Sequence, residues 1–311
     1  MKTSSLLKKS LTSESKLGHN FNSRKKYFVV AIALATIIKL YLSLTTLGSP
    51  DVLGYQDYLV KIRSFGGIGS YYAGGAYANP FNVPPLNIPV IRLMGWFADT
   101  TDLPFRFWLR LPCILADIGS FLLVCKLLSL TNRTFTFFLF ALCPASIMIS
   151  GFHGNSDPVM ISLVILSIYM IEIKRSVWLA AVVFGLALSI KVVPLIFLPA
   201  FMLYLPTLRQ KSIFISCVTA VFLAGSLPYL VQDPGIIAAK VFGYGSYYGV
   251  WGWTRLLYPI LGPSVDSSHP TGSHAVANRI GKVLLLLSIV AVSWWMNRRH
   301  HKQPLFVQVV S

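Results

Sequence analysis

The sequence has few acidic residues: ten Asp and Glu in 311 residues, against 27 Lys and Arg, for a net charge of +17. An excess of this size is typical of nucleic-acid-binding proteins, but its distribution indicates otherwise. Seven basic residues lie within the first 26 positions, and the cluster Arg298–Lys302 follows the last apolar stretch. Basic residues at the ends of apolar stretches mark the cytoplasmic side of a membrane protein, and no basic soluble domain is present.

Cysteine is also scarce, with only Cys113, Cys125, Cys143 and Cys217. All four lie in apolar stretches and show no paired spacing, so we expect buried thiols rather than disulfides or metal ligands. No internal repeat or low-complexity tract is evident.

Apolar residues make up 55% of the chain, and the mean hydropathy is +0.65. A run of roughly 20 apolar residues crosses the hydrocarbon core of a bilayer, and such runs recur along the sequence. We therefore predict an all-α, polytopic transmembrane helical bundle with about 8–10 membrane segments. The predicted spans are 27–47, 107–129, 134–152, 157–173, 177–192, 193–206, 212–231 and 281–297.

The first apolar run is too long for a cleavable signal peptide, so we interpret it as a retained helix after a basic cytoplasmic tail, 1–26. The positive-inside rule then places the loop 48–84 on the non-cytoplasmic side and the tail 298–311 in the cytoplasm. The segment 85–98 is short, which favours a re-entrant or interfacial element over a full crossing. Residues 27–206 form one predicted membrane module and 207–297 a second, variable one with a short helix near 251–262.

Two of the few acidic residues, Asp51 and Asp57, open the first non-cytoplasmic loop, where the apolar run ends. A carboxylate at this boundary can meet a lipid-carried substrate whose reactive head lies at the membrane surface. Within hydrogen-bond reach of an acceptor hydroxyl it can take the proton as general base, a contribution of about 10²–10⁴-fold in rate.

Other polar groups fall on the same predicted face of the membrane. They are His153, Asn155 and Asp157 in the second outward turn, Lys191 in the third, and Arg255 beside Trp251 and Trp253 in the fourth. Lys or Arg in a poorly hydrated site stabilises the charge of a departing lipid phosphate. The combination fits transfer of a sugar from a lipid phosphate to a hydroxyl.

Several motifs, in this order, are similar to those of one known family. They are Asp51 with Tyr55 four residues on and then Asp57, Tyr71-Tyr72 followed by Pro84-Pro85-Leu86, Asp117, the turn His153-Gly154-Asn155-Ser156-Asp157, and the stretch from Gly185 to Pro194 around Lys191. From Asp51 to about Leu205 the chain resembles the membrane module of the GT-C glycosyltransferases. It is similar in particular to the catalytic subunit of GPI mannosyltransferase I and to bacterial polyprenyl-phosphate-mannose mannosyltransferases.

The resemblance implies a mannosyltransferase that uses a polyprenyl- or dolichyl-phosphate sugar donor and a lipid or glycan acceptor. It implies Asp51 as general base, with Asp57 aiding or replacing it, and donor-phosphate binding by Lys191 with Arg255. Tyr55, His153, Asn155, Asp157 and Asp117 would shape the site.

The chain also departs from the family pattern. Asp51-Val52-Leu53 is not a full Asp-x-Asp pair, which leaves open whether Asp51 or Asp57 is the base. His153 stands where one version of the turn has Arg. Some GT-C enzymes use a divalent cation such as Mg²⁺ or Mn²⁺, and no ligand cluster for one is evident.

Each of these residues also has a purely structural interpretation. Asp51 and Asp157 are placed to begin helices, and Asp57 is a solvated charge. Asp117 ties helices together inside the membrane, Lys191 extends toward the interface, and Arg255 lies in an aromatic belt.

Two other functions remain open from the sequence: a transporter or flippase of lipid-linked sugars, and a non-catalytic membrane subunit of a transferase complex. A transporter places its ionisable groups near the bilayer midplane, where only Asp117 fits. Either the bacterial plasma membrane or the endoplasmic reticulum suits the sequence, and an accessory subunit is compatible with it.

Overall fold

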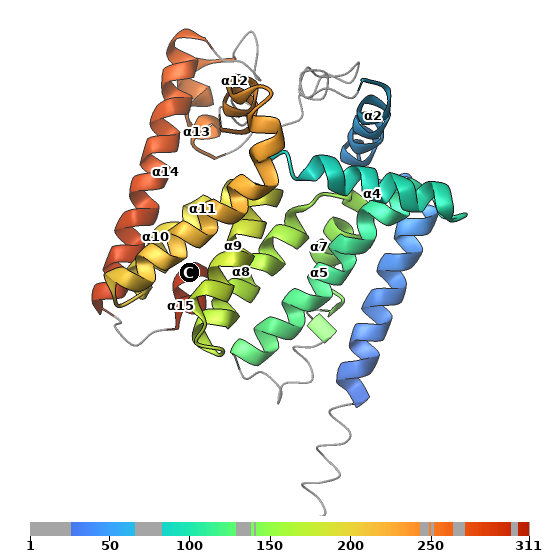
Figure 1. Ribbon diagram of the computed structural model, residues 1–311, viewed down its shortest axis with the longest axis horizontal. Coiled ribbons are helices and arrows are strands. Elements are labelled where there is room, and N and C mark those ends of the chain that lie inside the picture. Colours follow the sequence, from blue (N-terminus) through green and yellow to red (C-terminus); the bar gives the residue numbers. More distant parts are fainter. Residues whose placement is uncertain are drawn as a thin grey trace, which may run out of the picture. The chain divides into compact units, whose positions relative to one another are not determined.

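The computed structural model describes residues 26–65, 83–128, 138–139, 141–242, 249, 252–263, 271–299 and 304–310 (Figure 1). Within these ranges the secondary structure is helical and contains no strand, which confirms the predicted all-α class. Tyr71, Tyr72 and Trp251, which were singled out in the sequence, lie outside the described residues, as does most of the tail 1–26.

Four described helices are long and apolar enough to cross a membrane. They are the first helix (Lys26–Thr45), α5 (Phe105–Leu127), α11 (Leu208–Leu230) and most of α14 (Gly272–Arg299). A fifth span results if the stretch Pro144–His153 and helix α8 (Asp157–Glu172), bent by 119° relative to each other, count as one. The protein is therefore an integral membrane protein built from helices.

Shorter apolar helices account for the other predicted spans. Helix α9 (Val177–Ile190) has 14 residues, about 21 Å in length, too short to cross alone. It is followed by the 3₁₀ turn η3 (Val193–Phe197) and helix α10 (Leu198–Tyr204). Helix α4 (Asn87–Thr100) corresponds to the short segment 85–98, and α13 (Gly252–Leu261) to the short helix expected near 251–262.

The chain divides into two compact units, residues 1–56 with 93–162 and residues 57–92 with 163–311. In the first unit, the first helix packs against α5 through a core of small and aromatic side chains. Its members are Ala31, Ala35, Phe121, Cys125 and Ala141, with Phe28 stacked on Phe121 at a ring separation of 5.7 Å. Helix α5 also contacts the π-helical turn η2 (Met148–His153), which continues the short helix α7 (Pro144–Ile147).

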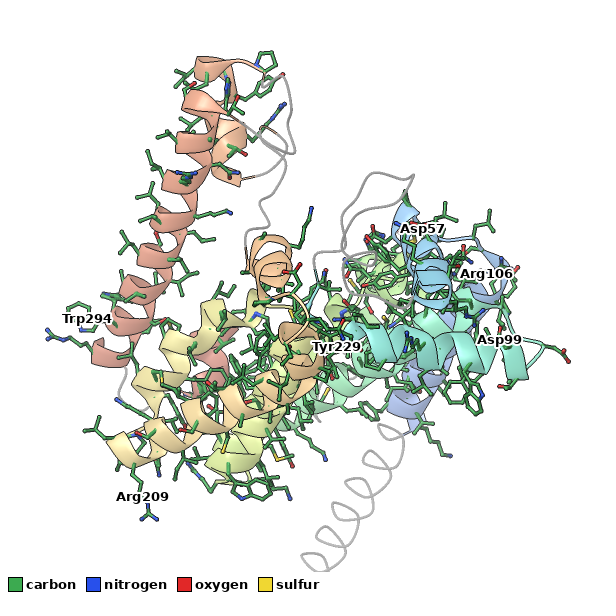
Figure 2. All side chains as sticks on the ribbon, turned by 45° about the horizontal axis from the view of Figure 1, so that its top comes forward. Asp57, Asp99, Arg106, Arg209, Tyr229 and Trp294 are labelled. Carbon is green, nitrogen blue, oxygen red and sulfur yellow. The ribbon has the colours of Figure 1, made fainter. Side chains whose placement is uncertain are left out.

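In the second unit, α9 packs along α11 around three fully buried rings, Phe184, Phe201 and Phe214. Their centroids lie 4.8–5.6 Å apart. Helix α14 contacts α10 and α13, and the C-terminal helix α15 (Leu305–Val310) contacts α10. Figure 2 shows Arg209, at the start of α11, and Trp294, near the end of α14, both directed away from their helices.

Local sequence explains where helices α2 and α8 begin. Helix α2 (Pro50–Phe65) has Pro50 at its first position. Ser49, just before it, caps the helix, because its hydroxyl accepts the Asp51 amide at 3.2 Å. Two residues before helix α8, Asn155 Oδ1 accepts the amide of Asp157, the first residue of that helix, at 3.2 Å. In both cases an acidic residue lies in the first turn, where the helix dipole favours it.

Candidate active site

Asp51 and His153, which were predicted from separate turns, meet in the first unit. His153 Nε2 lies 3.2 Å from Asp51 Oδ2. The two side chains are 40% and 44% exposed, so a substrate at the surface can reach them. A carboxylate held against an imidazole is suited to accept a proton from a hydroxyl group.

Hydrogen bonds from side chains to the main chain hold the segments that carry this pair. The Ser49 hydroxyl donates to the carbonyl of His153 at 2.8 Å, and the Cys113 thiol of α5 donates to the carbonyl of Asn155 at 3.1 Å. The positions of Asp51 and His153 are therefore fixed by side-chain to main-chain hydrogen bonds as well as by the contact between their own side chains. Ser49 caps α2, so Asp51 is not itself the cap; it occupies the first turn.

Tyr55 lies one helical turn after Asp51, on the same side of α2. Desolvation raises the pKa of Tyr55 to about 12, the Ser156 hydroxyl lowers it in part, and the charges of Asp51 and Asp157 add to the increase. Tyr55 is therefore a neutral phenol at physiological pH. It brings an aromatic surface and one hydroxyl group next to Asp51, Ser156 and Asp157.

Asp57 has a different environment. It lies six residues after Asp51 on α2, which puts it about 120° away around the helix. Its carboxylate is 3.0 Å from Lys61 Nζ, one turn further along the same helix. Asp57 is thus already paired with a cation, in the compact unit formed by residues 57–92 and 163–311.

In that same unit, Lys191 follows the last residue of α9 in an extended conformation, with φ −147° and ψ 148°. The buried amide of Asn87, the first residue of α4, donates to the carbonyl groups of Pro84 at 2.9 Å and Ile190 at 3.1 Å. It also lies 3.3 Å from the carbonyl of Ser189. Carbonyl groups at the end of a helix lack helical partners, so Asn87 fixes the point at which the chain leaves α9 for Lys191.

Arg255 lies on α13 and is exposed. Its guanidinium donates to the carbonyl of Gly249 at 3.3 Å and lies over the ring of Tyr258, 5.4 Å from the centroid. Its role as a donor-phosphate ligand stays a prediction.

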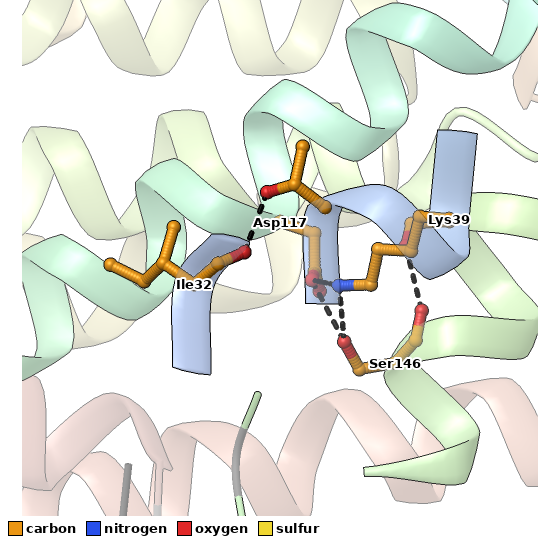
Figure 3. A network of polar contacts seen from close by, with 6 residues as sticks. Ile32, Lys39, Asp117 and Ser146 are labelled. Atoms are coloured by element: carbon orange, nitrogen blue, oxygen red, sulfur yellow. Dashed lines mark hydrogen bonds and ion pairs between the residues drawn. The ribbon is translucent and has the colours of Figure 1, made fainter. Parts of the chain in front are cut away.

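Asp117 lies inside the membrane-spanning part of the first unit, on α5. Its carboxylate is paired with Lys39 of the first helix and accepts the Ser146 hydroxyl at 2.8 Å, and Lys39 also donates to Ser146 at 2.9 Å (Figure 3). Lys39 is 1% exposed. The structure thus gives Asp117 a partner from each of two other helical segments, as its structural interpretation requires.

The sequence reasoning missed Ser49, Asn87, Lys39 and Arg110. Lys39 and Arg110 carry the same signal that drew attention to Asp117, a charge inside a predicted span. Ser49 and Asn87 act through contacts with residues more than 100 positions away, and no local pattern marks them.

The described residues bring no three His, Cys, Asp or Glu side chains together as a metal site requires. Asp51 and His153 supply two ligands at most.

These features define a multi-pass helical membrane protein with an accessible carboxylate–imidazole pair where two helical segments meet. Residues 149–258 match the mannosyltransferase family described as Mannosyltransferase (PIG-M). This match confirms the resemblance found in the sequence: the chain is similar to GPI mannosyltransferase I. The matched region contains His153, Asn155, Asp157, Lys191 and Arg255.

No curated protein and no solved structure matches the chain.

Proposed function

We propose that the protein transfers mannose from a polyprenyl- or dolichyl-phosphate donor to a hydroxyl group of a lipid or glycan acceptor, on the non-cytoplasmic side of the membrane. The observation that carries the proposal is the pairing of Asp51 with His153 in a chain whose residues 149–258 match a mannosyltransferase family. The basic clusters at both chain ends support the assignment of the membrane face.

In the proposed reaction the acceptor oxygen attacks C1 of the mannosyl phosphate. The bond from C1 to the phosphate oxygen breaks, and its electron pair leaves with the lipid phosphate. Asp51 takes the hydroxyl proton as the new bond forms, and His153 holds the carboxylate in position. A single displacement of this kind inverts the configuration at C1.

The leaving phosphate gains negative charge and needs a cation nearby. Lys191 is the proposed residue, because the hydrogen bonds of Asn87 hold its backbone at the end of α9. Arg255 is the second candidate. Asp57 is a weaker choice for the base than Asp51, since Lys61 already pairs with its carboxylate.

Asp117 was the residue that best fitted a transporter, and its contacts argue against that role. A transporter residue needs to be available to a passing substrate, whereas Asp117 is tied to Lys39 and Ser146. The family match in addition supports an enzyme.

The test is mannose transfer by the purified protein in liposomes, from radiolabelled polyprenyl-phosphate-mannose to extracted membrane lipids. We expect transfer by the wild type and a loss of about 10²-fold or more in Asp51→Asn, the size expected for a general base. Asp99→Asn removes an exposed carboxylate at the end of α4 and serves as the matched control, with activity near wild type (Figure 2). Asp51→Asn retaining a tenth or more of the activity would move the base to another residue.

A further inference from the structure

Arg110 is the largest side chain that the first unit buries completely, with no exposed surface. It lies in the second turn of α5, and its Nη1 donates to the end of the first helix. The acceptors are the carbonyl groups of Leu42 at 3.1 Å, Thr46 at 3.2 Å and Ser43 at 3.4 Å, and the Thr46 hydroxyl at 3.1 Å. These carbonyl groups lie at the C-terminal end of the helix, where its dipole favours a cation. The Leu42 carbonyl also accepts the Thr46 amide at 3.1 Å and the Thr46 hydroxyl at 2.6 Å.

The rest of the Arg110 side chain fills the space between two tight turns. Gly48 and Gly154 both have positive φ, 90° and 74°, which favours glycine. A Cβ atom on Gly48 would lie 1.9 Å from Arg110 Nη2. One on Gly154 would meet Val52 first, at 2.6 Å, and would be in ordinary contact with Arg110 Cγ at 3.6 Å. The two backbones thus approach the same side chain from different segments of the chain.

These turns lead directly to the proposed catalytic pair. Gly48 precedes Asp51 by three residues, and Gly154 follows His153. The Ser49 hydroxyl, between Gly48 and Asp51, bonds the carbonyl of His153. Displacement of the guanidinium therefore frees both turns at once, and the 3.2 Å separation of Asp51 and His153 depends on both.

We propose that Arg110 is a positioning residue for the Asp51–His153 pair. The inference rests on the proposed function. Because Arg110 has no exposed surface, it acts through the two turns and does not touch the substrate. Nε and Nη2 have no hydrogen-bond partner in the described part of the chain, so Nη1 alone supplies the polar contacts of the guanidinium there.

The test compares Arg110→Gln and Arg110→Lys with Arg106→Gln. Arg106 lies one turn earlier on α5 and makes one exposed bond of 3.3 Å, to the carbonyl of Leu44, so it is a matched control. We expect Arg110→Gln to lower kcat by about tenfold or more, since a misplaced catalytic group costs up to 10²-fold, with the KM for the donor changed less than threefold. Arg110→Lys keeps the charge and an N–H donor, and we expect it to restore part of kcat. Arg106→Gln should stay within about twofold of wild type on both constants.

A second measurement separates positioning from general loss of stability. In an Asp51→Asn background, Arg110→Gln should reduce the residual rate no further, because the two changes remove the same catalytic contribution. A further loss equal to that seen in the wild-type background would overturn the proposal. So would a kcat within about twofold of wild type for Arg110→Gln.

Hydrogen–deuterium exchange tests whether Arg110 holds the two turns, and it requires no sugar donor. We expect faster amide exchange at residues 46–52 and 152–156 in Arg110→Gln and unchanged exchange there in Arg106→Gln. If the wild type transfers no sugar, the proposed function fails while exchange still decides whether Arg110 holds the two turns. If the wild type is active and Arg110→Gln shows unchanged exchange, the positioning role of Arg110 is wrong while the proposed function stands.

Discussion

At the scale of single residues, Tyr55 shows how a partly buried site controls protonation. Its folded pKa of about 12 is above the ordinary value of 10, because desolvation disfavours the phenolate. The folded state therefore keeps the proton that the unfolded state releases between about pH 10 and 12, and stability falls as pH rises through that window. Below pH 10 Tyr55 contributes no pH dependence.

Two results follow for Tyr55→Phe, which removes the phenol hydroxyl. The wild type should lose thermal stability between pH 10 and 12 more steeply than the variant, measured by tryptophan fluorescence during heating in detergent. Between pH 6 and 9 the transfer rates of the two proteins should have the same pH profile. A profile altered in that range would assign a protonic role to Tyr55.

The site residues also show what the sequence could and could not reveal. Asp51, His153 and Lys191 could be singled out as candidates because each is a polar residue at the end of an apolar run. The sequence could not distinguish Asp51 from Asp57, because the difference lies in their contacts: His153 for one and Lys61 for the other. The role of Asn87 could not be predicted from the sequence, since its effect on Lys191 comes through carbonyl groups about 100 residues away.

At the scale of helices, hydropathy predicted most elements to within a few residues, because a membrane forces backbone hydrogen bonds into helices. The predicted span 177–192 is helix α9, and 85–98 is α4. The π-helical turn at Met148–His153 was not predictable. Its wider turn depends on packing against α5 rather than on apolar spacing.

The Lys39–Asp117 pair gives a prediction about helix association. Asp117→Leu alone leaves Lys39 charged and buried, and Lys39→Met alone leaves the carboxylate; each should cost about 3–5 kcal/mol. The double variant Lys39→Met/Asp117→Leu removes both charges and should recover most of the loss. Thermal unfolding of the four proteins in detergent gives the coupling energy. A double variant as unstable as the sum of the single changes would show that the pair is not coupled.

For the whole molecule, the charge distribution predicts which side each polar turn faces, and a labelling experiment tests this. Leu53 is exposed on α2, and Arg209 is exposed at the start of α11. In a background without the four native cysteines, Leu53→Cys should react with a membrane-impermeant maleimide in sealed vesicles whose non-cytoplasmic side faces out. Arg209→Cys should react only after permeabilisation. The reverse pattern would invert the proposed topology and move Asp51 to the cytoplasm.

The ion pair between Lys39 and Asp117 has one more consequence, for the response to membrane voltage. A single charge moved across a potential of 100 mV gains or loses about 2.3 kcal/mol. A lysine and an aspartate that move together carry no net charge, so the field does no net work on them. This pair can therefore hold three helical segments together in an energised membrane without coupling their positions to the potential.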